Sequence, residues 1–492
     1  MEEASTRLEH SRSLRLAEGV SGMDAEGLAA HLEAQRIVVS LERRIPHGPL
    51  AARVLVSTLR RLPGELILDA HELKDADIER LTAAADAVDP DRPLNVARRP
   101  QGADMYLHVG PNAPAAGIRL LPDGHGAQLV ADPTRGLCRP EPASALGAVT
   151  AAALGAAEAF KGVAYVRADR QRPQPYLRFC PVTLGADPRA AAALVHRHEI
   201  AVTLVGLGAV GTAIALIISE LDFTGTVVLC DPERYEPENR GTYSLGSAAD
   251  ATSRPWKVDL AARTLARFNS RRFRGTAAEL MTTIDAGRLP WTRLLLAGLD
   301  SRAARHDAQR LWPDHLIDAA TSDTSLGLHL GRPGGACLMC FLPARREGPS
   351  APERHAAALG LPAALLGDGN HVLTAADLRD LDPEGKARLR PHLGKPVCGL
   401  ARAVGLTELE PGGYRPAVPF VSQLAACLAV GRALAIEGNA RLTDTNFVQF
   451  DALVGPRTAV IEARRPRSAC SCQQRAETIS RVRASRSASI PP

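Results

Sequence analysis

The stretch that decides the fold runs Ile200-Ala-Val-Thr-Leu-Val205, then Gly206-Leu-Gly208-Ala-Val-Gly211, and reaches Asp231 after a helical run and a second apolar run. A short β-branched run that ends at glycine predicts a buried parallel strand. Glycines at the turn let the backbone approach a phosphate, and the following helix N-terminus favours negative charge. An acid about 20 residues further on can bond a ribose hydroxyl. This order predicts a Rossmann-like nucleotide-binding domain rather than a plain tight turn, with four candidate binding residues: Gly206, Gly208, Gly211 and Asp231.

The composition is that of a folded globular chain. Its 492 residues suit two or three domains, with 45% hydrophobic and 23% charged residues. The net charge of +5 is spread among 59 basic and 54 acidic residues, so it gives no reason to expect nucleic acid or membrane binding. We expect no signal peptide and no membrane span. Nine cysteines, four of them in two close pairs, suit thiol or metal chemistry, so we expect a cytoplasmic protein.

Helical runs alternate with short apolar runs along most of the chain, which predicts the α/β class with a parallel-rich sheet. The last residues are rich in Ser and Arg and nearly devoid of large apolar residues. We expect six parts: an N-terminal helical or flexible segment (1–35), an α/β domain (36–190), the core of the nucleotide-binding domain (198–343), a helical insert (344–397), the closing part of that domain (398–474), and a disordered tail (475–492).

The two α/β parts end in similar sequences. A small-residue helix, Phe420–Gly438, precedes the strand-like run TNFVQFDAL, as the helix Ala143–Lys161 precedes PYLRFCPVTL. The likeness predicts either a pseudo-repeat or merely two Ala-rich helices of similar composition.

Two residues after Asp231 distinguish the candidate nucleotides. Adenylation needs a cation beside the triphosphate to offset charge as pyrophosphate leaves, and a carboxylate to hold Mg²⁺. Lys257 precedes a helical run, and Asp300 ends the apolar run LLLAGLD. Taken singly, Lys257 reads as an exposed helix-end lysine and Asp300 as a helix N-cap. Taken together and in this order, they favour Mg·ATP.

At these residues the chain resembles the ubiquitin-activating superfamily, which includes the ThiF, MoeB and HesA types of adenylating enzyme. The resemblance covers Ile200–Pro343 and, more loosely, Lys395–Cys472. It implies that Asp231 binds the ribose, that Asn239 and Lys257 face the phosphates, and that Asp300 coordinates Mg²⁺. It also implies that the N-terminal α/β domain is an inactive counterpart of the adenylating domain, since family enzymes work as pairs of such domains.

The arginines depart from the family pattern. The family's arginine lies three residues after the asparagine, where this chain has Thr242, while Arg240 follows Asn239 directly. Glu233 replaces a second aspartate, and Arg305 stands at another family arginine position. Arg240 remains a candidate catalytic residue whose role the sequence leaves open.

Four cysteines form two close pairs, Cys337/Cys340 and Cys470/Cys472. Four thiolates can close a tetrahedral structural zinc site when the fold brings two pairs together. The resemblance supports zinc, because many family members attach their C-terminal strand in this way. The second pair is C-x-C rather than C-x-x-C, so free or redox-active thiols remain the alternative.

Cys398 lies in Gly394-Lys-Pro-Val-Cys398-Gly, after the expected insert. In the family, a cysteine at this point attacks the acyl-adenylate and carries the product as a thioester. Neighbouring glycines give the segment freedom, and Lys395 can favour the thiolate. The alternative is an inert buried cysteine.

We therefore expect an ATP-dependent enzyme that adenylates the C-terminal carboxylate of a ubiquitin-like or sulfur-carrier protein. A thioester on Cys398 and transfer to a conjugating enzyme would follow, as in bacterial systems that resemble ubiquitination. The alternatives are an adenylation-only enzyme acting on a peptide or carrier, an NAD-dependent oxidoreductase, and a non-catalytic nucleotide-binding scaffold. The sequence leaves open whether the protein is a homodimer.

Overall fold

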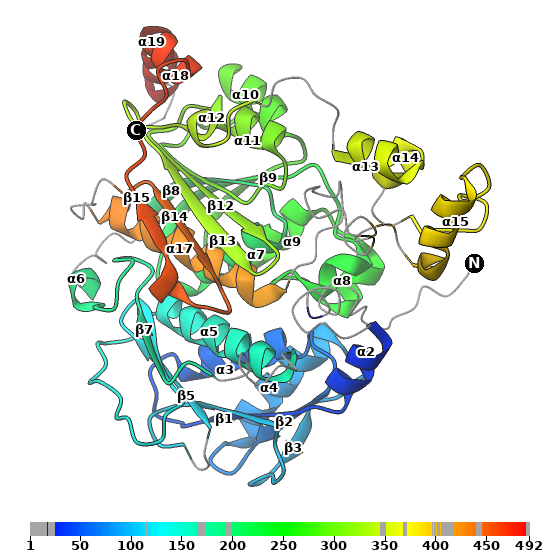
Figure 1. The fold of residues 1–492 in the computed structure, drawn as a ribbon. Helices are drawn as coiled ribbons and strands as arrows, with labels where there is room; N and C mark the ends of the chain where they lie inside the picture. The colour runs from blue at the N-terminus through cyan, green and yellow to red at the C-terminus, as the bar shows by residue number, and fades with distance from the viewer. Residues whose placement is uncertain are drawn as a thin grey trace. The chain divides into compact units, whose positions relative to one another are not determined.

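The computed structural model describes most of the chain: residues 17, 25–113, 117–164, 173–192, 199–344, 351–367, 371–395, 397, 400, 404, 418–438 and 445–488 (Figure 1). The chain divides into two compact units. One comprises Met1–Pro343 with Ala417–Pro492, and the other comprises Ala344–Pro416. The larger unit contains two sheets and the candidate nucleotide site.

The first sheet has seven strands in the order β3-β2-β1-β4-β5-β6-β7. Pairing is parallel from β3 to β5 and antiparallel from β5 to β7. The strands are β1 (Arg36–Leu41), β2 (Glu65–Asp69), β3 (Asn95–Ala97), β4 (Met105–Val109), β5 (Ile118–Asp123), β6 (Gly126–Val130) and β7 (Tyr176–Phe179). The helices of this half are α2 (Ala25–Glu33), α3 (Gly48–Leu59), α4 (Asp75–Val88), α5 (Ala145–Ala164) and α6 (Arg189–Ala192).

The second sheet has eight strands in the order β10-β9-β8-β11-β12-β13-β14-β15, again parallel up to β12 and antiparallel after it. The strands are β8 (Glu199–Val205), β9 (Thr224–Cys230), β10 (Asn269–Phe273), β11 (Leu294–Ala297), β12 (His315–Ser322), β13 (Ser325–Gly331), β14 (Phe447–Asp451) and β15 (Val460–Glu462). The helices are α7 (Ala209–Glu220), η1 (Pro237–Gly241), α8 (Ala248–Ser253), α9 (Lys257–Thr264), α10 (Ala277–Asp285), α11 (Arg302–Gln309), α12 (Leu338–Phe341), α17 (Pro419–Glu437), η3 (Pro456–Thr458), α18 (Ser471–Gln474) and α19 (Ala476–Ala488).

The two sheets are copies of one topology, which confirms the pseudo-repeat. Strand order and direction agree from β1 to β7 and from β8 to β14. Helices α5 and α17 occupy the same place in each copy, after the antiparallel hairpin and before the next strand. Ala127 and Leu326 lie at the same distance from their hairpin turns, and they pair with Phe179 and Phe450, respectively. Phe179 and Phe450 are therefore equivalent residues, and their rings meet edge to face at 5.9 Å.

The two halves pack through their closing helices. Helix α5 packs on β5 and β6, α17 packs on β12 and β13, and the helices pack on each other (Figure 1). Phe160 and Phe420 meet there with ring centres 5.4 Å apart. A helix that is apolar all round needs burial on every side, and alanines let neighbouring backbones come close. Both helices are long and apolar enough to span a membrane, but 94% of each apolar window is buried within the protein.

The smaller unit is described by itself. It contains α13 (Ala351–Leu359), α14 (Ala363–Gly367), α15 (Pro383–Leu389) and η2 (Arg390–His392) around a cluster of leucines. Leu400 and Val404 belong to this cluster, and the unit extends to Pro416. The expected boundary between residues 397 and 398 is therefore wrong, because apolar contacts continue past it.

The expectation of a disordered tail from residue 475 is also wrong. Residues Ala476–Ala488 form α19, and Arg486 in its last turn is buried. Arg486 binds both carboxylate oxygens of Asp285 and the carbonyl oxygens of Arg310 and Leu311. Polar contacts order this helix, which is why its lack of large apolar residues was misleading. Residues 489–492 lie outside the described part of the chain.

Candidate nucleotide and metal sites

The predicted nucleotide residues meet at one edge of the second sheet. Val205, Cys230 and Ala297 end the parallel strands β8, β9 and β11, and Val205 is paired with both of the others. The Gly206 turn, Asp231 and the Asp300 segment follow directly. Ligands of such sheets bind at the carboxyl ends of the strands, where the strand order reverses. Here that point lies between β8 and β11.

The glycine turn has the geometry that the sequence predicted. Gly206 has φ of +81°, in the region that favours glycine. A Cβ at position 211 would lie 2.0 Å from the carbonyl oxygen of Gly206, so α7 can pack on the turn only because Gly211 has no side chain. A Cβ at Gly208 would meet nothing nearer than the Tyr243 hydroxyl at 3.6 Å. This middle glycine therefore borders open space, where a phosphate could approach.

Asp231 follows the neighbouring strand β9, and its carboxylate accepts a hydrogen bond from the glycine turn. Its Oδ2 accepts the N–H of Leu207 at 2.6 Å and its Oδ1 accepts the N–H of Glu233 at 2.9 Å. Only 5% of the residue is exposed, and this burial raises the pKa of the carboxyl, although Lys257 and the two N–H donors favour the charged form. The remaining lone pairs of the carboxylate are suited to a ribose hydroxyl.

Lys257 is a fixed positive charge beside the same turn. It is the first residue of α9 and only 4% exposed, so the alternative of an exposed helix-end lysine is wrong. Its Nζ donates to the Glu233 carboxylate and lies 5.2 Å from the centre of the Tyr243 ring. Burial alone would lower the pKa of Lys257, but Tyr243, Asp231 and Glu233 together raise it above its usual value. The side chain therefore stays an ammonium.

Asp300 presents an available carboxylate. It is exposed and makes no hydrogen bond or ion pair to the residues that the structure describes. The N-cap of α11 is Ser301, whose Oγ accepts the N–H of Ala304, so Asp300 is not needed for capping. An exposed carboxylate at this edge can share Mg²⁺ with substrate phosphates, which is how proteins commonly hold this ion.

Arg305 has a different partner from the one expected for a phosphate-binding arginine. Its Nε donates to Asp318 at 3.0 Å, and its Nη2 donates to the carbonyl oxygen of Leu299. Asp318 is fully buried and also contacts His329 Nδ1 at 2.9 Å. Arg305 therefore fixes the backbone directly before Asp300, as a positioning residue.

Asn239 and Arg240 both lie in η1 and are buried. The Oδ1 of Asn239 accepts the N–H of Glu236 at 2.9 Å, so the amide oxygen caps η1 and the NH₂ group is the part suited to a phosphate. Burial lowers the pKa of Arg61 to about 10, and the nearby charge of Arg240 lowers it as well. Burial raises the pKa of Tyr235, and the charge of Arg240 opposes that rise. A catalytic role for Arg240 remains a prediction.

Arg61 is a contributor that sequence reasoning missed. It comes from the first half, directly after α3, and is 2% exposed. Its Nε donates to the carbonyl oxygen of Arg240 at 2.8 Å and its Nη2 to that of Tyr243 at 2.6 Å. The N-terminal half therefore holds the segment that carries Asn239 and Tyr243. Both acceptors are backbone atoms, which leave no signal in the sequence.

The first sheet lacks the nucleotide residues. The two sheets can be aligned residue by residue through their strand registers, starting from the hairpins β5–β6 and β12–β13. In this alignment, Leu41 is equivalent to Gly206 and Ala70 is equivalent to Asp231. The corresponding edge is instead filled by a buried polar cluster, in which Ser40 contacts His108 at 2.7 Å and Tyr106 donates to Asp69 at 2.8 Å. These substitutions favour an inactive first half.

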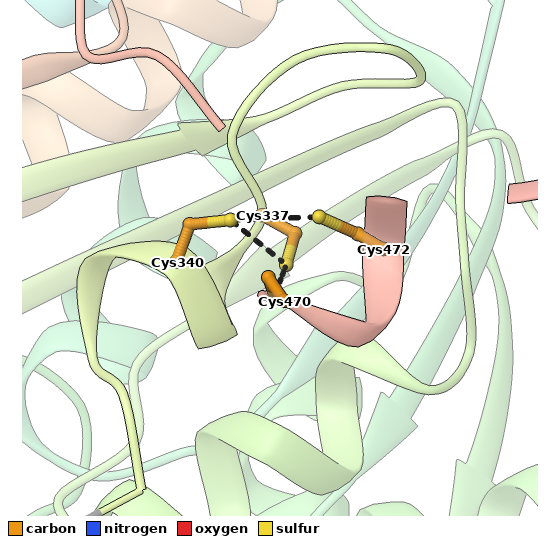
Figure 2. A group of neighbouring side chains, drawn as sticks. All are labelled: Cys337, Cys340, Cys470 and Cys472. Atoms are coloured by element: carbon orange, nitrogen blue, oxygen red, sulfur yellow. Dashed lines mark hydrogen bonds between the residues drawn. The ribbon is translucent and has the colours of Figure 1, made fainter. Parts of the chain in front are cut away.

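The four paired cysteines meet at one point, as Figure 2 shows. Cys337 is the N-cap of α12 and Cys340 lies within that helix. In the same way, Cys470 is the N-cap of α18 and Cys472 lies within it. The sulfur atoms lie 3.5 to 3.8 Å apart in the three contacting pairs. Zn–S bonds of about 2.3 Å in a tetrahedron place the sulfurs about 3.8 Å apart. The N–H of Arg467 points at the Cys340 sulfur at 3.4 Å. The four thiolates fit a closed structural zinc site.

Cys398 lies outside the described residues, so its expected role is not tested by the geometry. Of the other cysteines, Cys180, Cys230 and Cys427 are buried and Cys138 is exposed.

Comparison with known proteins bears directly on the C-terminal half. The sequence model of the ThiF family matches residues 192–472, more than half of the chain. The chain belongs to the ThiF family. This membership confirms the resemblance stated above and supports ATP-dependent adenylation at the level of the family.

Solved structures give more distant likenesses. E. coli MccB with selenomethionine MccA has 11% identity and a TM-score of 0.35, covering 73% of this chain and 97% of that chain. E. coli MccB with ATP has 12% identity and a TM-score of 0.34, covering 72% and 97%. Selenomethionine PaaA has 11% identity and a TM-score of 0.31, covering 56% and 65%. No curated protein matches the chain by sequence.

Proposed function

We propose that the chain uses Mg·ATP to adenylate the C-terminal carboxylate of a ubiquitin-like or sulfur-carrier protein. The observation that carries this proposal is the shared strand edge. There, an open glycine turn, a buried acid and an exposed carboxylate follow the adjacent strands β8, β9 and β11, and the buried ammonium of Lys257 interacts with that acid, Asp231. Dehydrogenases need the turn and the ribose-binding acid but have no use for Lys257 and Asp300.

The reaction assigns one role to each group. A carboxylate oxygen of the substrate attacks the α-phosphorus, the bond to the pyrophosphate oxygen breaks, and an acyl-adenylate and pyrophosphate result. Negative charge grows on the leaving group, where the ammonium of Lys257 stabilises it. Asp300 would hold Mg²⁺ against the phosphates. Asp231 would bind the ribose, and Arg61 and Arg305 would keep the surrounding backbone in place.

The second step of the proposal uses Cys398. Its thiolate would attack the carbonyl carbon of the acyl-adenylate and release AMP, which leaves a thioester for a conjugating enzyme. Cysteine is suited to this transfer because a thiolate is strongly nucleophilic near neutral pH. We also propose that the protein acts in the cytoplasm, where cysteines remain reduced.

Two measurements test the two steps separately. ATP–pyrophosphate exchange, measured with a panel of small proteins ending in glycine, should be stimulated by the cognate protein. Incubation with that protein and ATP should then give a reductant-sensitive band on a non-reducing gel. Cys398→Ala should remove the band and keep the exchange, whereas Cys138→Ala, at an exposed cysteine, should keep both.

The outcomes distinguish the alternatives. Exchange without any band identifies an adenylation-only enzyme. Tighter binding of NAD than of ATP, with no exchange, contradicts the proposal and supports an oxidoreductase.

A further inference from the structure

In the described part of the chain, the first sheet ends at β7, at the position where the second sheet has a further strand. Strand β14 pairs with β15 on its outer side, through Gln449 with Val460 and Phe447 with Glu462. Its counterpart β7 is the last strand of the first sheet among the described residues. By the hairpin register, Arg178 is equivalent to Gln449 and Tyr176 to Phe447. Among the residues that the structure describes, the first half thus has no counterpart of β15.

The backbone of β7 has N–H and C=O groups that point away from β6, where a further strand could pair. The N–H of Ala131 donates to the carbonyl oxygen of Pro175, so that oxygen faces β6. Because successive residues of an antiparallel strand alternate in direction, the N–H and C=O groups of Tyr176 and Arg178 point to the open side. Arg457 Nη2 donates to the Tyr176 carbonyl from that side at 2.5 Å. The outward groups belong to the residues whose equivalents in β14 pair with β15.

A cavity of about 610 Å³ lies along this edge. It is lined by all four residues of β7, by the segment after it, and by the segment between β14 and β15. Its volume is in the range of pockets that bind small ligands.

The lining carries more positive than negative charge, although two of its arginines, Arg178 and Arg189, pair with acids outside it, Asp123 and Glu141. Its charged residues are four arginines and one aspartate: Arg139, Arg178, Arg189, Arg457 and Asp187. The Nε of Arg178 pairs with the buried Asp123 at 2.6 Å, but its buried Nη2 has no hydrogen-bond partner among the described residues. A buried guanidinium donor without a partner is costly, and a carboxylate is its best acceptor.

We propose that this edge binds an extended, acidic peptide segment of a partner protein, which adds to β7 as an antiparallel strand. Main-chain hydrogen bonds to Arg178 and to the N–H of Tyr176 would align the peptide, as in other cases of strand addition, while the Tyr176 carbonyl oxygen keeps its bond from Arg457. Acidic side chains would meet the arginines around it. The strand that the peptide would extend, β7, belongs to the half that lacks the nucleotide residues, so the site gives that half a recognition role apart from adenylation.

The test selects peptides against the full-length protein from a random ten-residue library displayed on phage. We expect enriched sequences with two or more acidic residues, whose synthetic fluorescent versions bind in an anisotropy assay. Arg189→Glu should weaken binding about fivefold or more, because it reverses one charge of the lining. Arg80→Glu is the matched control, since both side chains are similarly exposed, at 69% and 66%, and each pairs with one acid.

Two further readouts examine the geometry. Two peptides should be compared, one N-methylated at the odd-numbered amides and one at the even-numbered amides. One methylation phase should abolish binding and the other should leave it nearly unchanged, because only one edge of a strand faces β7. The bound peptide should also slow alkylation of the exposed Cys138, which lines the cavity, as measured by mass spectrometry. Enrichment of neutral or basic peptides, equal effects of Arg189→Glu and Arg80→Glu, or equal effects of the two methylation phases would overturn the proposal.

Discussion

Lys257 and Asp300 lie at the same edge of the sheet, but the charge of Lys257 is buried and that of Asp300 is exposed. Lys257 is buried and its ammonium is stabilised by Tyr243, Asp231 and Glu233, so replacing it would also disturb the packing around it. Asp300 is exposed and has no partner in the described part of the chain, so replacing it removes a ligand and little else. Asp300 is therefore the better residue for separating function from stability.

We predict that Asp300→Ala lowers the rate of ATP–pyrophosphate exchange by about 100-fold or more, because the metal loses its protein carboxylate. The unfolding free energy should change by less than about 0.5 kcal/mol, as for other exposed positions. Exchange kinetics and urea denaturation measure the two effects. Asp222→Ala, at a carboxylate that is 93% exposed after α7, is the control and should leave both unchanged. Normal exchange in Asp300→Ala would remove this residue from the proposed mechanism.

His108 predicts a pH dependence of stability. Burial lowers its pKa to about 4, whereas the unfolded chain takes up a proton near pH 6.5. As the pH falls from 7, the unfolded state is protonated first, so the protein loses stability between about pH 6.5 and pH 4. The loss at pH 5 is on the order of 2 kcal/mol.

His108→Gln should lose correspondingly less stability than the wild type between pH 7 and pH 5 in urea unfolding. His71→Gln, at an exposed histidine, should follow the wild type. An identical pH response in His108→Gln would show that His108 is not buried as a neutral residue.

At the scale of elements, the cysteine cluster joins two segments that are about 130 residues apart, α12 and α18. We predict one zinc ion per chain, measured by elemental analysis. Cys472→Ser should release it and lower the unfolding free energy by about 3 kcal/mol or more, because metal binding contributes directly to folding. Cys138→Ser should retain the metal. Protein that is fully stable and free of zinc after metal-replete expression would rule the site out.

Helix α19 gives a second prediction at this scale. Arg486 makes two bonds to Asp285 and two to the carbonyls at the end of α11, so Arg486→Ala should cost about 1 to 2 kcal/mol of stability. Arg481 lies on the same helix but is exposed, and Arg481→Ala should cost less than about 0.5 kcal/mol. Equal effects of the two substitutions in thermal or urea unfolding would argue against the docking of α19.

The elements that the sequence could predict are those whose chemistry is local. The strand, glycine turn and helix from Glu199 to Glu220 follow from backbone constraints within a few residues, and the cysteine pairs follow from the geometry of metal ligands. Arg61 and Arg486 act on partners 179 and 201 positions away, and several of these partners are backbone carbonyls common to every residue. Nothing in the sequence around them indicates such partners. For the same reason, the sequence predicts a disordered tail where the structure has α19.

At the scale of the whole molecule, one chain contains two sheets of the same topology, and the residues predicted to bind the nucleotide lie at the second. The closing helices α5 and α17 and the equivalent rings of Phe179 and Phe450 join the halves. Arg61 extends this contact to the edge of the nucleotide site. The first half therefore supports the second through packing and hydrogen bonds, and its own open edge at β7 is left for recognition.

We expect one Mg·ATP to bind per chain, at the glycine turn of the second half. Isothermal titration calorimetry of the full-length protein with ATP and with NAD, each in the presence of Mg²⁺, tests it most directly. We expect one ATP per chain, tighter binding of ATP than of NAD, and loss of the magnesium dependence in Asp300→Ala. Tighter binding of NAD, or two equivalent ATP sites per chain, would contradict it.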